Sequence, residues 1–379
     1  MASSIRRYDL DWLRVIVFAL LIFYHVGMFF VPWGWHIKNN VIYEWLRWPM
    51  LFLNQWRLPI LFVISGMGTY YALSKRSLGQ FSWERFKRLG IPLFVGMLLI
   101  VPPQIYIERL VNAQFDGSYW EFLATKALRG GPYPEGNLSW HHLWFLPYLL
   151  LFSLVLGPVF VRLKRSSSKL VDWTKRQLQK SYGFYVFVPP LFLVEGLVEP
   201  FFPITHALIG DWFNIIFSLL FFFYGFLLIA CGDLFWENLY KVKYKALVIG
   251  SIAFTLLVCR WLLIEKDGPL EHFMEAFLKV TNIWSWILVL FAYAAQWLNK
   301  PSQGLAYANR AVYPFYILHQ TITIVIAYFL MDLEWNLFIK ASILVLGTFG
   351  VSWLLYDLLI LRIPWLHPLF GLKKATSSK

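Results

Sequence analysis

Ten apolar runs of about 20 residues, separated by short polar segments, dominate this sequence. A helix of about 20 residues crosses the roughly 30 Å of hydrocarbon in a membrane. Lipid offers backbone groups no hydrogen-bonding partners, so each crossing segment must be helical. We therefore predict an all-α integral membrane protein, a bundle of about ten transmembrane helices. The predicted spans are 12–32, 49–74, 90–108, 141–161, 184–201, 212–231, 246–264, 276–298, 312–331 and 337–361.

The composition supports a membrane protein and argues against a nucleic-acid partner. Hydrophobic residues make up 59% of the 379 residues and charged residues 15%, against roughly 45–50% and about 25% in soluble domains. The net charge is +13, but the Lys and Arg residues lie mostly in short loops between apolar runs, with no basic domain. Cys231 and Cys259 are expected near opposite faces of the membrane, so we predict neither a disulfide nor a cysteine metal motif.

The loop charges predict which side of the membrane each loop occupies. Lys and Arg are concentrated in alternate loops, and the positive-inside rule makes these loops cytoplasmic. Both termini are then cytoplasmic, the basic linker 162–183 lies on the inner leaflet, and 109–140 is the longest outer loop. We expect residues 5–361 to form one transmembrane domain and 362–379 a short basic cytoplasmic tail, with no cleavable signal peptide.

Charged side chains inside the first predicted span are the first candidates for function. Asp11 and Arg14 lie one turn apart and can pair, and His25 follows eleven residues after Arg14. Eleven residues are close to three turns, so Arg14 and His25 point to one face, roughly 16 Å apart along the axis. Arg14, at the inner mouth, suits a phosphate-rich donor such as acyl-coenzyme A, unless it is an ordinary inside anchor. His25, past mid-membrane, suits proton removal from a hydroxyl, unless it is a satisfied core histidine.

The second predicted span contains one charged residue, Arg57, which is a candidate for binding a ligand. Arg57 starts on the outer side, so it faces the same cavity as His25 and binds an anionic or sugar group, or it is an interfacial arginine among belt tryptophans. Further along the span, Ser65 and Gly66 favour close helix packing over chemistry.

The segment 140–147 opens the fourth span with two histidines and two tryptophans. His142 and Trp144 either hold a sugar, whose apolar face the rings would cover, or belong to an aromatic belt. We expect no metal site here. Adjacent histidines point apart on a helix, and no third ligand has a suitable spacing for zinc.

The ninth span carries Tyr313 and His319. We expect His319 two turns into the membrane, on the inner half, where it flanks the donor's path or hydrogen-bonds across helices. The other spans contain further charges, namely Glu195, Arg260 and Asp357. We expect Arg260 to pair with Glu265.

Four short segments follow one another along the chain in a recognisable order. They are Asp11-x-x-Arg14 followed by ten residues and His25, then Phe62-Val63-Ile64-Ser65-Gly66, then His142-Leu143-Trp144-Phe145-Leu146, and last Tyr313-x-x-Tyr316-x-x-His319. Together they resemble the signature of membrane-bound acyltransferase family 3, over about residues 5–361. Within that family the chain looks most like the branch containing periplasmic-glucan succinyl transferases. The second segment has one aromatic residue where two are common.

This resemblance implies a multi-span inner-membrane enzyme without a bound cofactor. Such enzymes take an acyl group from a cytoplasmic donor, usually acyl-coenzyme A, and place it on an extracytoplasmic acceptor such as an O-antigen sugar, exopolysaccharide, periplasmic glucan or peptidoglycan. The acyl group here would be acetyl or succinyl. Some relatives carry a fused SGNH-type hydrolase domain after the last helix, whereas this chain ends at Lys379. If the reaction needs a second domain, we expect a separate periplasmic partner to supply it.

The residues and the resemblance together assign the expected roles. His25 is the catalytic base or a transient acyl carrier. The phosphates of acyl-coenzyme A dock near Arg14 and the basic loop 75–88, and the pantetheine arm reaches up to His25. The expected donor-binding residues are Asp11, Arg14, Arg85 and Arg88. The expected acceptor-binding or supporting residues are Arg57, Ser65, His142, Trp144, Tyr313 and His319.

Two other functions fit the same features. A secondary transporter or exporter of a glycolipid or small anion also has many spans and buried charges, although the two halves show no matching hydropathy or broken helices. The third possibility is a structural or assembly subunit, in which the buried charges only form ion pairs. The sequence has no G-x-x-x-x-G-K-[ST], G-x-S-x-G or H-E-x-x-H motif.

Overall fold

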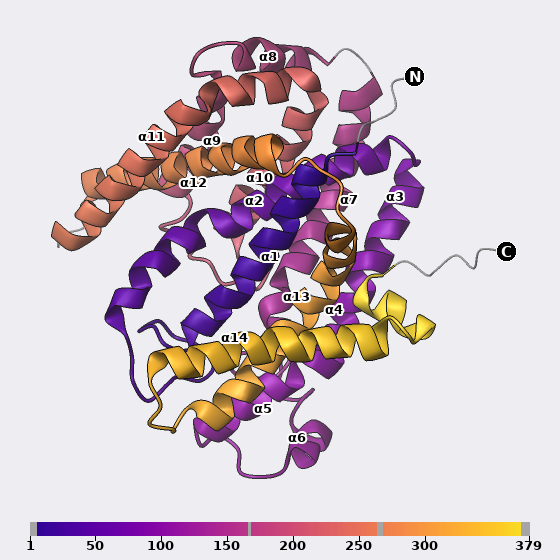
Figure 1. Ribbon diagram of the computed structural model, residues 1–379, viewed down its shortest axis with the longest axis vertical. Helices are drawn as coiled ribbons and strands as arrows, with labels where there is room; N and C mark the ends of the chain where they lie inside the picture. Colours follow the sequence, from indigo (N-terminus) through magenta and orange to yellow (C-terminus); the bar gives the residue numbers. More distant parts are fainter. Residues whose placement is uncertain (1–5, 166–167, 264–267, 373–379) are drawn as a thin grey trace. The chain divides into compact units, whose positions relative to one another are not determined.

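The computed structural model describes residues 6–165, 168–263 and 268–372, and this part of the chain is almost entirely helical (Figure 1). It contains no β-strand within those residues, only an isolated bridge between Pro132 and Leu138. Glu265 and the last seven residues of the expected tail lie outside the described part.

The predicted spans correspond to helices of the structure. Nine helices among the described residues are long and apolar enough to cross a membrane. They are Tyr8–Met28, Glu44–Leu73, Leu78–Val111, His141–Lys164, Trp212–Ala230, Asp233–Leu263, Pro269–Trp297, Gln303–Leu330 and Leu337–Ile360. The remaining predicted span is the shorter apolar helix Gly183–Leu197. The prediction of an all-α membrane protein with about ten helical spans is therefore confirmed.

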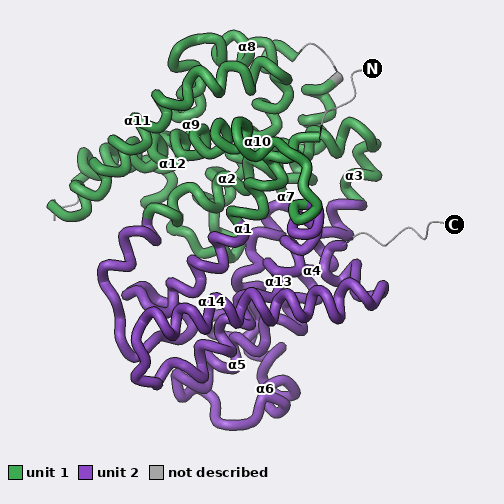
Figure 2. Tube along the Cα trace, viewed as in Figure 1, with its two compact units in different colours: residues 1–17, 52–83, 151–305 green, residues 18–51, 84–150, 306–379 purple. Residues whose placement is uncertain are grey.

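The chain divides into two compact units, each assembled from segments far apart in the sequence (Figure 2). Unit 1 consists of residues 1–17, 52–83 and 151–305. Unit 2 consists of residues 18–51, 84–150 and 306–379.

Unit 1 contains most of α2 (Arg47–Leu73) and α7 (Phe145–Arg165), nearly all of α3 (Leu78–Arg85), and α8 (Lys169–Leu178), α9 (Val188–Leu197), α10 (Trp212–Ala230), α11 (Asp233–Leu263) and α12 (Pro269–Trp297). Helices α11 and α12 pack against each other along their length. Two buried charges are paired here: Lys279 Nζ lies 2.8 Å from Glu195 Oε1, and Arg260 lies 3.7 Å from Glu275. The expected partner of Arg260, Glu265, is outside the described residues.

Glycines let α2 and α10 approach closely in unit 1. A Cβ atom added at Gly66 would lie 1.9 Å from the Phe222 carbonyl oxygen, and one at Gly225 would lie 2.0 Å from the Val63 carbonyl oxygen. No side chain fits in either place, and such small-residue contacts are common between membrane helices. The packing role expected for Gly66 is confirmed.

Unit 2 contains the second half of α1 (Tyr8–Met28), the short helices α4 (Ile91–Val95), α5 (Pro102–Val111) and α6 (Tyr119–Thr125), most of α13 (Gln303–Leu330), and α14 (Leu337–Leu354). Its apolar core joins α1, α5, α13 and α14 through buried side chains such as Val26, Ile107, Ile324 and Leu344. The π-helical segment Gly96–Ile100 precedes α5. Such segments are frequent near functional sites because they shift the helical register.

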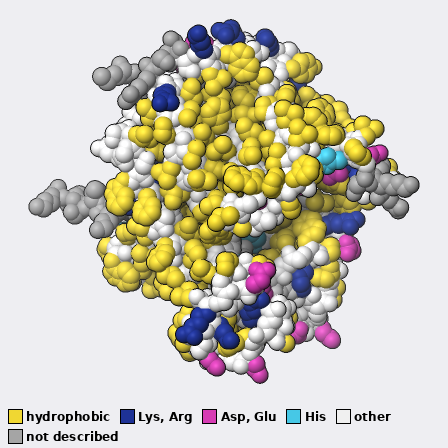
Figure 3. Space-filling view, turned by 180° about the vertical axis from the view of Figure 1, so that it is seen from behind, with side chains coloured by type: hydrophobic (Ala, Val, Ile, Leu, Met, Phe, Trp, Pro, Cys, Tyr) yellow, Lys and Arg dark blue, Asp and Glu magenta, His cyan; other side chains and the backbone are white. Residues whose placement is uncertain are grey.

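The surface is largely apolar. Hydrophobic side chains cover much of the face in Figure 3, and large residues such as Leu99, Phe329, Phe338 and Leu346 are exposed. A soluble monomer rarely exposes such extensive apolar area. Contact with lipid explains this surface, in agreement with the multi-pass assignment.

Candidate active site

Two histidines from different helices of unit 2 form a direct hydrogen bond. His25 Nδ1 in α1 lies 2.7 Å from His319 Nε2 in α13, and the two rings are stacked with their centroids 4.9 Å apart. His319 is fully buried, whereas His25 is half-buried. The family segments that end in His25 and His319 therefore meet in space, although they are separated by 294 positions in the chain.

The hydrogen bonds around this pair fix which ring nitrogen carries the proton. His319 Nδ1 lies 2.7 Å from the Tyr316 carbonyl oxygen, which can only accept a hydrogen bond. His319 is therefore protonated on Nδ1, and its Nε2 accepts the hydrogen bond from His25 Nδ1–H. In neutral imidazole one nitrogen donates and the other accepts, so the lone pair of His25 is on Nε2.

This geometry corrects the predicted depth of His319. The sequence placed His319 on the inner half of the membrane and His25 beyond its middle. Side chains joined by a 2.7 Å hydrogen bond lie at the same depth. The prediction that His25 and His319 lie in different halves of the membrane was therefore wrong. The cause is the start of α13, which begins at Gln303 rather than near residue 312 and so carries His319 further along the helix.

His142 lies beside the His25–His319 pair. Its Nε2–H donates to the Ile317 carbonyl oxygen at 3.0 Å, and its Nδ1 accepts from the Gln104 amide nitrogen at 3.3 Å. Its ring stands perpendicular to that of His319, with the centroids 5.2 Å apart. The Tyr316 hydroxyl donates to the His142 carbonyl oxygen at 2.6 Å. These contacts attach the 3-10 helix His141–Trp144 to α13.

Polar side chains continue from His142 to a second cluster. Gln320 donates to the Gln104 side-chain oxygen at 3.0 Å, and its amide nitrogen also lies 3.1 Å from His36 Nε2. Sequence reasoning did not single out Gln104, Gln320 or His36. A buried glutamine within an apolar run is the signal that could have identified the first two, since an amide in a span needs a partner.

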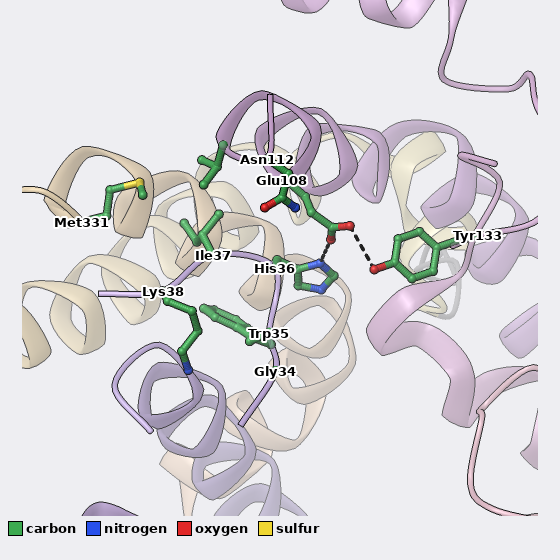
Figure 4. Close-up of a pocket in the computed structure, with 10 residues that line it drawn as sticks. Gly34, Trp35, His36, Ile37, Lys38, Glu108, Asn112, Tyr133 and Met331 are labelled. Atoms are coloured by element: carbon green, nitrogen blue, oxygen red, sulfur yellow. Dashed lines mark hydrogen bonds and ion pairs between the residues drawn. The ribbon is translucent and has the colours of Figure 1, made fainter. Parts of the chain in front are cut away.

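His36 and Glu108 are the core of this second cluster. His36 Nδ1 contacts a Glu108 carboxylate oxygen, and the Tyr133 hydroxyl donates to the other oxygen at 2.9 Å. Figure 4 shows His36 and Tyr133 pointing toward the carboxylate from opposite sides. Burial and the Glu108 charge raise the pKa of Tyr133 to about 12, so its hydroxyl remains a donor at neutral pH.

These residues line a cavity of about 690 Å³, here called the His36 pocket. Its other polar or aromatic lining residues are Trp35, Lys38 and Asn112. The Lys38 ammonium donates to the carbonyl oxygens of Met28 at 2.5 Å and of Trp33 at 3.0 Å. Burial lowers the pKa of Lys38 to about 8.

The loop that carries His36 is held by a buried lysine of α14. Lys340 Nζ donates to Asn39 Oδ1 at 2.6 Å and to Asn40 Oδ1 at 3.0 Å. A buried ammonium needs such hydrogen bonds to offset its desolvation. The loop between α1 and α2 is therefore held at two places: the Lys38 ammonium contacts its first part, and Lys340 contacts Asn39 and Asn40.

Unit 1 has a separate basic cavity of about 380 Å³, here called the Arg14 pocket. Its charged lining residues are Arg6, Arg7, Asp11, Arg14 and Lys75. Arg14 lies 3.4 Å from Asp11, so the expected pair is confirmed. Arg6 and Arg14 pair with Asp11, and Arg7 pairs with Asp9, so four cations are opposed by two carboxylates. The excess positive charge suits a phosphate-bearing group.

The other predicted residues are spread over both units. Arg57 is buried in the unit 1 part of α2, so its expected place opposite His25 stays a prediction. Ser65 is half-buried, and its carbonyl oxygen accepts from Thr69 at 2.9 Å. Trp144, in unit 2, packs edge-on against Tyr148.

The remaining predicted residues belong to unit 2. The buried hydroxyl of Tyr313 has no hydrogen-bond partner among the described residues. Arg85 is half-buried at the end of α3, and Arg88 is exposed in the following π-helical turn. Both arginines belong to unit 2, whereas the Arg14 pocket belongs to unit 1. Their shared role with Arg14 in donor binding stays a prediction.

Comparison with known families identifies the chain. The family profile described as an acyltransferase domain, acyltransferase 3, matches residues 7–357. The chain belongs to the acyltransferase 3 family. No solved structure matches it. The expected family is therefore confirmed, and this acyltransferase 3 protein is an enzyme that transfers acyl groups rather than a transporter or a purely structural subunit.

Similar proteins share one name. This acyltransferase 3 chain is 25% identical to glucans biosynthesis protein C of Escherichia coli strain SMS-3-5, over 97% of this chain and 94% of the relative. It is 24% identical, with the same coverage of both chains, to the proteins of that name in Escherichia coli K12 and in Salmonella paratyphi B. The expected likeness to a glucan-modifying branch agrees with this name.

Proposed function

We propose that this acyltransferase 3 protein moves an acetyl or succinyl group from cytoplasmic acyl-coenzyme A to a hydroxyl of an extracytoplasmic glycan or glycolipid. The bacterial inner membrane is the proposed location, with both termini in the cytoplasm. The name of the similar proteins makes a glucan the first acceptor to test. The observation that carries the proposal is the hydrogen bond between His25 and His319.

The histidine pair suits general base catalysis. His25 Nε2 would take the proton from the acceptor hydroxyl as the hydroxyl oxygen attacks the thioester carbonyl. The resulting imidazolium keeps its Nδ1–H directed at His319 Nε2, which stabilises the positive charge. When the carbon–sulfur bond breaks, the departing thiolate takes the proton from His25. The products are the ester and free coenzyme A, and His25 returns to its neutral form.

Transient acylation of His25 is the second route to the same products. In that case His25 Nε2 attacks the thioester and carries the acyl group until the acceptor hydroxyl displaces it. Both routes need the Nδ1–H of His25 to be held by His319. Only the second route labels the protein in the absence of acceptor.

The Arg14 pocket suits the donor. Its four cations match the phosphates of coenzyme A, and its position on α1 suits a donor whose thioester reaches His25. Arg14 and His25 are eleven residues apart on one helix, roughly 16 Å along its axis. An extended pantetheine arm covers that length. A separate periplasmic protein remains a proposed partner, and membrane lipid surrounds the enzyme.

Mass spectrometry of cell glycans tests the proposal. A deletion strain would be complemented with wild type, with His25→Ala, or with His272→Gln as a matched control. His272 lies in unit 1, donates to the Gly196 carbonyl oxygen and has no part in the proposed reaction. We expect one acyl mass per modified sugar with wild type and the control, and none with His25→Ala at equal protein level. Unchanged glycans in all strains would contradict the proposed acceptor class, and full acylation by His25→Ala would contradict the mechanism.

A further inference from the structure

Three side chains with metal-binding atoms meet in unit 2, and two of them line the His36 pocket. They are His36 from the loop after α1, Glu108 from α5 and His141 from the 3-10 helix His141–Trp144. One possible ligand atom from each lies within 4.8 Å of those of the other two. The segments that supply them are 33 or more positions apart, so spacing in the sequence could not predict this group.

His141 supplies an observation that points to a ligand. Its Nε2 atom is buried and has no hydrogen-bond partner among the described residues, whereas its Nδ1 lies 2.9 Å from Ser139 Oγ. The imidazole is thus held by one nitrogen, while the other has no hydrogen-bond partner among the described residues. In folded proteins a buried polar atom almost always has a hydrogen-bond partner or contacts a bound water or ion. The ring lies close to His36, with the centroids 4.6 Å apart.

Each of the three side chains is oriented by a second residue. Ser139 holds His141, the Tyr133 hydroxyl donates to Glu108 Oε1 at 2.9 Å, and the Gln320 amide lies 3.1 Å from His36 Nε2. Metal ligands are usually oriented by such outer hydrogen bonds. The atoms that these contacts leave for an ion are His141 Nε2, Glu108 Oε2 and His36 Nδ1.

We propose that His36, Glu108 and His141 bind one divalent transition-metal ion, with zinc the expected ion. Two imidazoles and one carboxylate form a ligand set that zinc uses at sites with an open fourth position. Magnesium and calcium prefer oxygen ligands only, so the two histidines argue against them. Because His36 and Glu108 both line the His36 pocket, the open position is available to water or to a substrate oxygen.

Metal binding requires a defined change of protonation. His36 Nδ1 now contacts Glu108 and must lose any proton before it can ligate an ion. The proton is then on His36 Nε2, which faces the Gln320 amide. A half-turn of the Gln320 amide presents its oxygen as the acceptor, and it breaks the hydrogen bond that the amide nitrogen now donates to the Gln104 oxygen.

The ion would join three segments beside the histidine pair. His141 is followed directly by His142, whose ring contacts Gln104 and packs against His319. Occupancy of the site would therefore hold His142 in place. This positioning role rests on the proposed function, whereas the existence of the site does not, because metal content is measured without any acyl transfer.

Elemental analysis of the purified full chain tests the site. The protein would carry a streptavidin-binding tag rather than a polyhistidine tag, since the latter binds zinc itself. We expect about one equivalent of zinc in wild type and in His272→Gln, and a loss of at least tenfold in His141→Gln and Glu108→Gln. Titration with a zinc-binding dye gives the affinity. We expect Tyr133→Phe, which retains all three ligands, to weaken it by about 10–100-fold.

The outcomes are distinct. Stoichiometric binding of zinc or another first-row metal that disappears with His141→Gln supports the site. Metal far below one equivalent after incubation with zinc, or equal metal in wild type and all variants, would overturn it. Size-exclusion elution and thermal unfolding check that each variant is folded. If His141→Gln fails to fold, the comparison of Tyr133→Phe and Ser139→Ala with wild type decides the question, because neither variant removes a ligand.

Discussion

His25 and His319 share a hydrogen bond of 2.7 Å in which His25 Nδ1 is the donor. The direction of this bond is set by the backbone of α13, because the Tyr316 carbonyl oxygen requires a proton on the other nitrogen of His319. His319 therefore acts on His25 as a buried hydrogen-bond acceptor, comparable in position to the carboxylate that orients a catalytic histidine in other enzymes. It is a positioning residue for the proposed reaction.

Replacing His319 tests this relationship. We expect His319→Ala to lower kcat by about 10²–10⁴-fold, the range for losing general base catalysis, with little change in KM for the donor. His319→Gln retains a side-chain acceptor and should recover part of the loss. A purely structural role would predict equal losses in both variants, in proportion to their thermal destabilisation. Activity measured against pH adds a second readout, since a purely structural role would leave the shape of that profile unchanged.

Arg14 is expected to act on the donor and not on the chemical step. We expect Arg14→Gln to raise KM for acyl-coenzyme A by about tenfold, which corresponds to about 1.4 kcal/mol of binding free energy. Arg14→Lys should lose less, because it keeps the charge, though not the planar fork of donors. For an acyl-pantetheine donor, which lacks the nucleotide phosphates, the KM should be the same in wild type and in both variants. Arg47→Gln, at an exposed pair with Glu44, is the control. An unchanged KM in Arg14→Gln would contradict the assignment of the Arg14 pocket.

The membrane spans and the Asp11–Arg14 pair could be predicted from the sequence because each depends only on residues close together in the chain. An apolar run of about 20 residues decides a membrane helix regardless of its neighbours. Asp11 and Arg14 pair because side chains three positions apart on a helix lie on the same face, and the structure shows this pair. Gly66 could be read as a packing residue for a similar reason, since small residues recur where membrane helices touch.

The second cluster and the depth of His319 could not be predicted, because they depend on contacts between distant segments. His36 lies in a loop and Glu108 near the end of a span, and neither position suggests a partner. Spacing along the chain offers His141 no third zinc ligand, whereas in the fold His141 meets His36 and Glu108 from two other segments. The depth of His319 depended on where α13 begins, and helix ends are the least certain feature of a sequence prediction.

The approach of α2 to α10 leads to a stability prediction. We expect Gly66→Ala to destabilise the protein by about 1–3 kcal/mol, because its Cβ would overlap the Phe222 carbonyl oxygen and backbone atoms must shift. Gly68→Ala, two positions along the same helix, has no atom within 4 Å of the added Cβ and should be neutral or slightly stabilising. Thermal unfolding of the detergent-solubilised variants compares the two. Equal melting temperatures would show that α2 and α10 do not pack through Gly66.

Lys38 allows the membrane orientation and the state of the His36 pocket to be measured together. Burial lowers its pKa from 10.5 to about 8, and an amine reacts with acylating reagents only when it is neutral. A membrane-impermeant N-hydroxysuccinimide ester added to intact spheroplasts should therefore label Lys38 with a rate that rises to a plateau just above pH 8. The labelled peptide is quantified by mass spectrometry, with Lys126, exposed in the same predicted outer region, as the reference for access. Labelling of Lys38 and Lys126 only in inverted vesicles would reverse the predicted orientation. A Lys38 rate that is still rising steeply above pH 10 would contradict its burial beside the pocket.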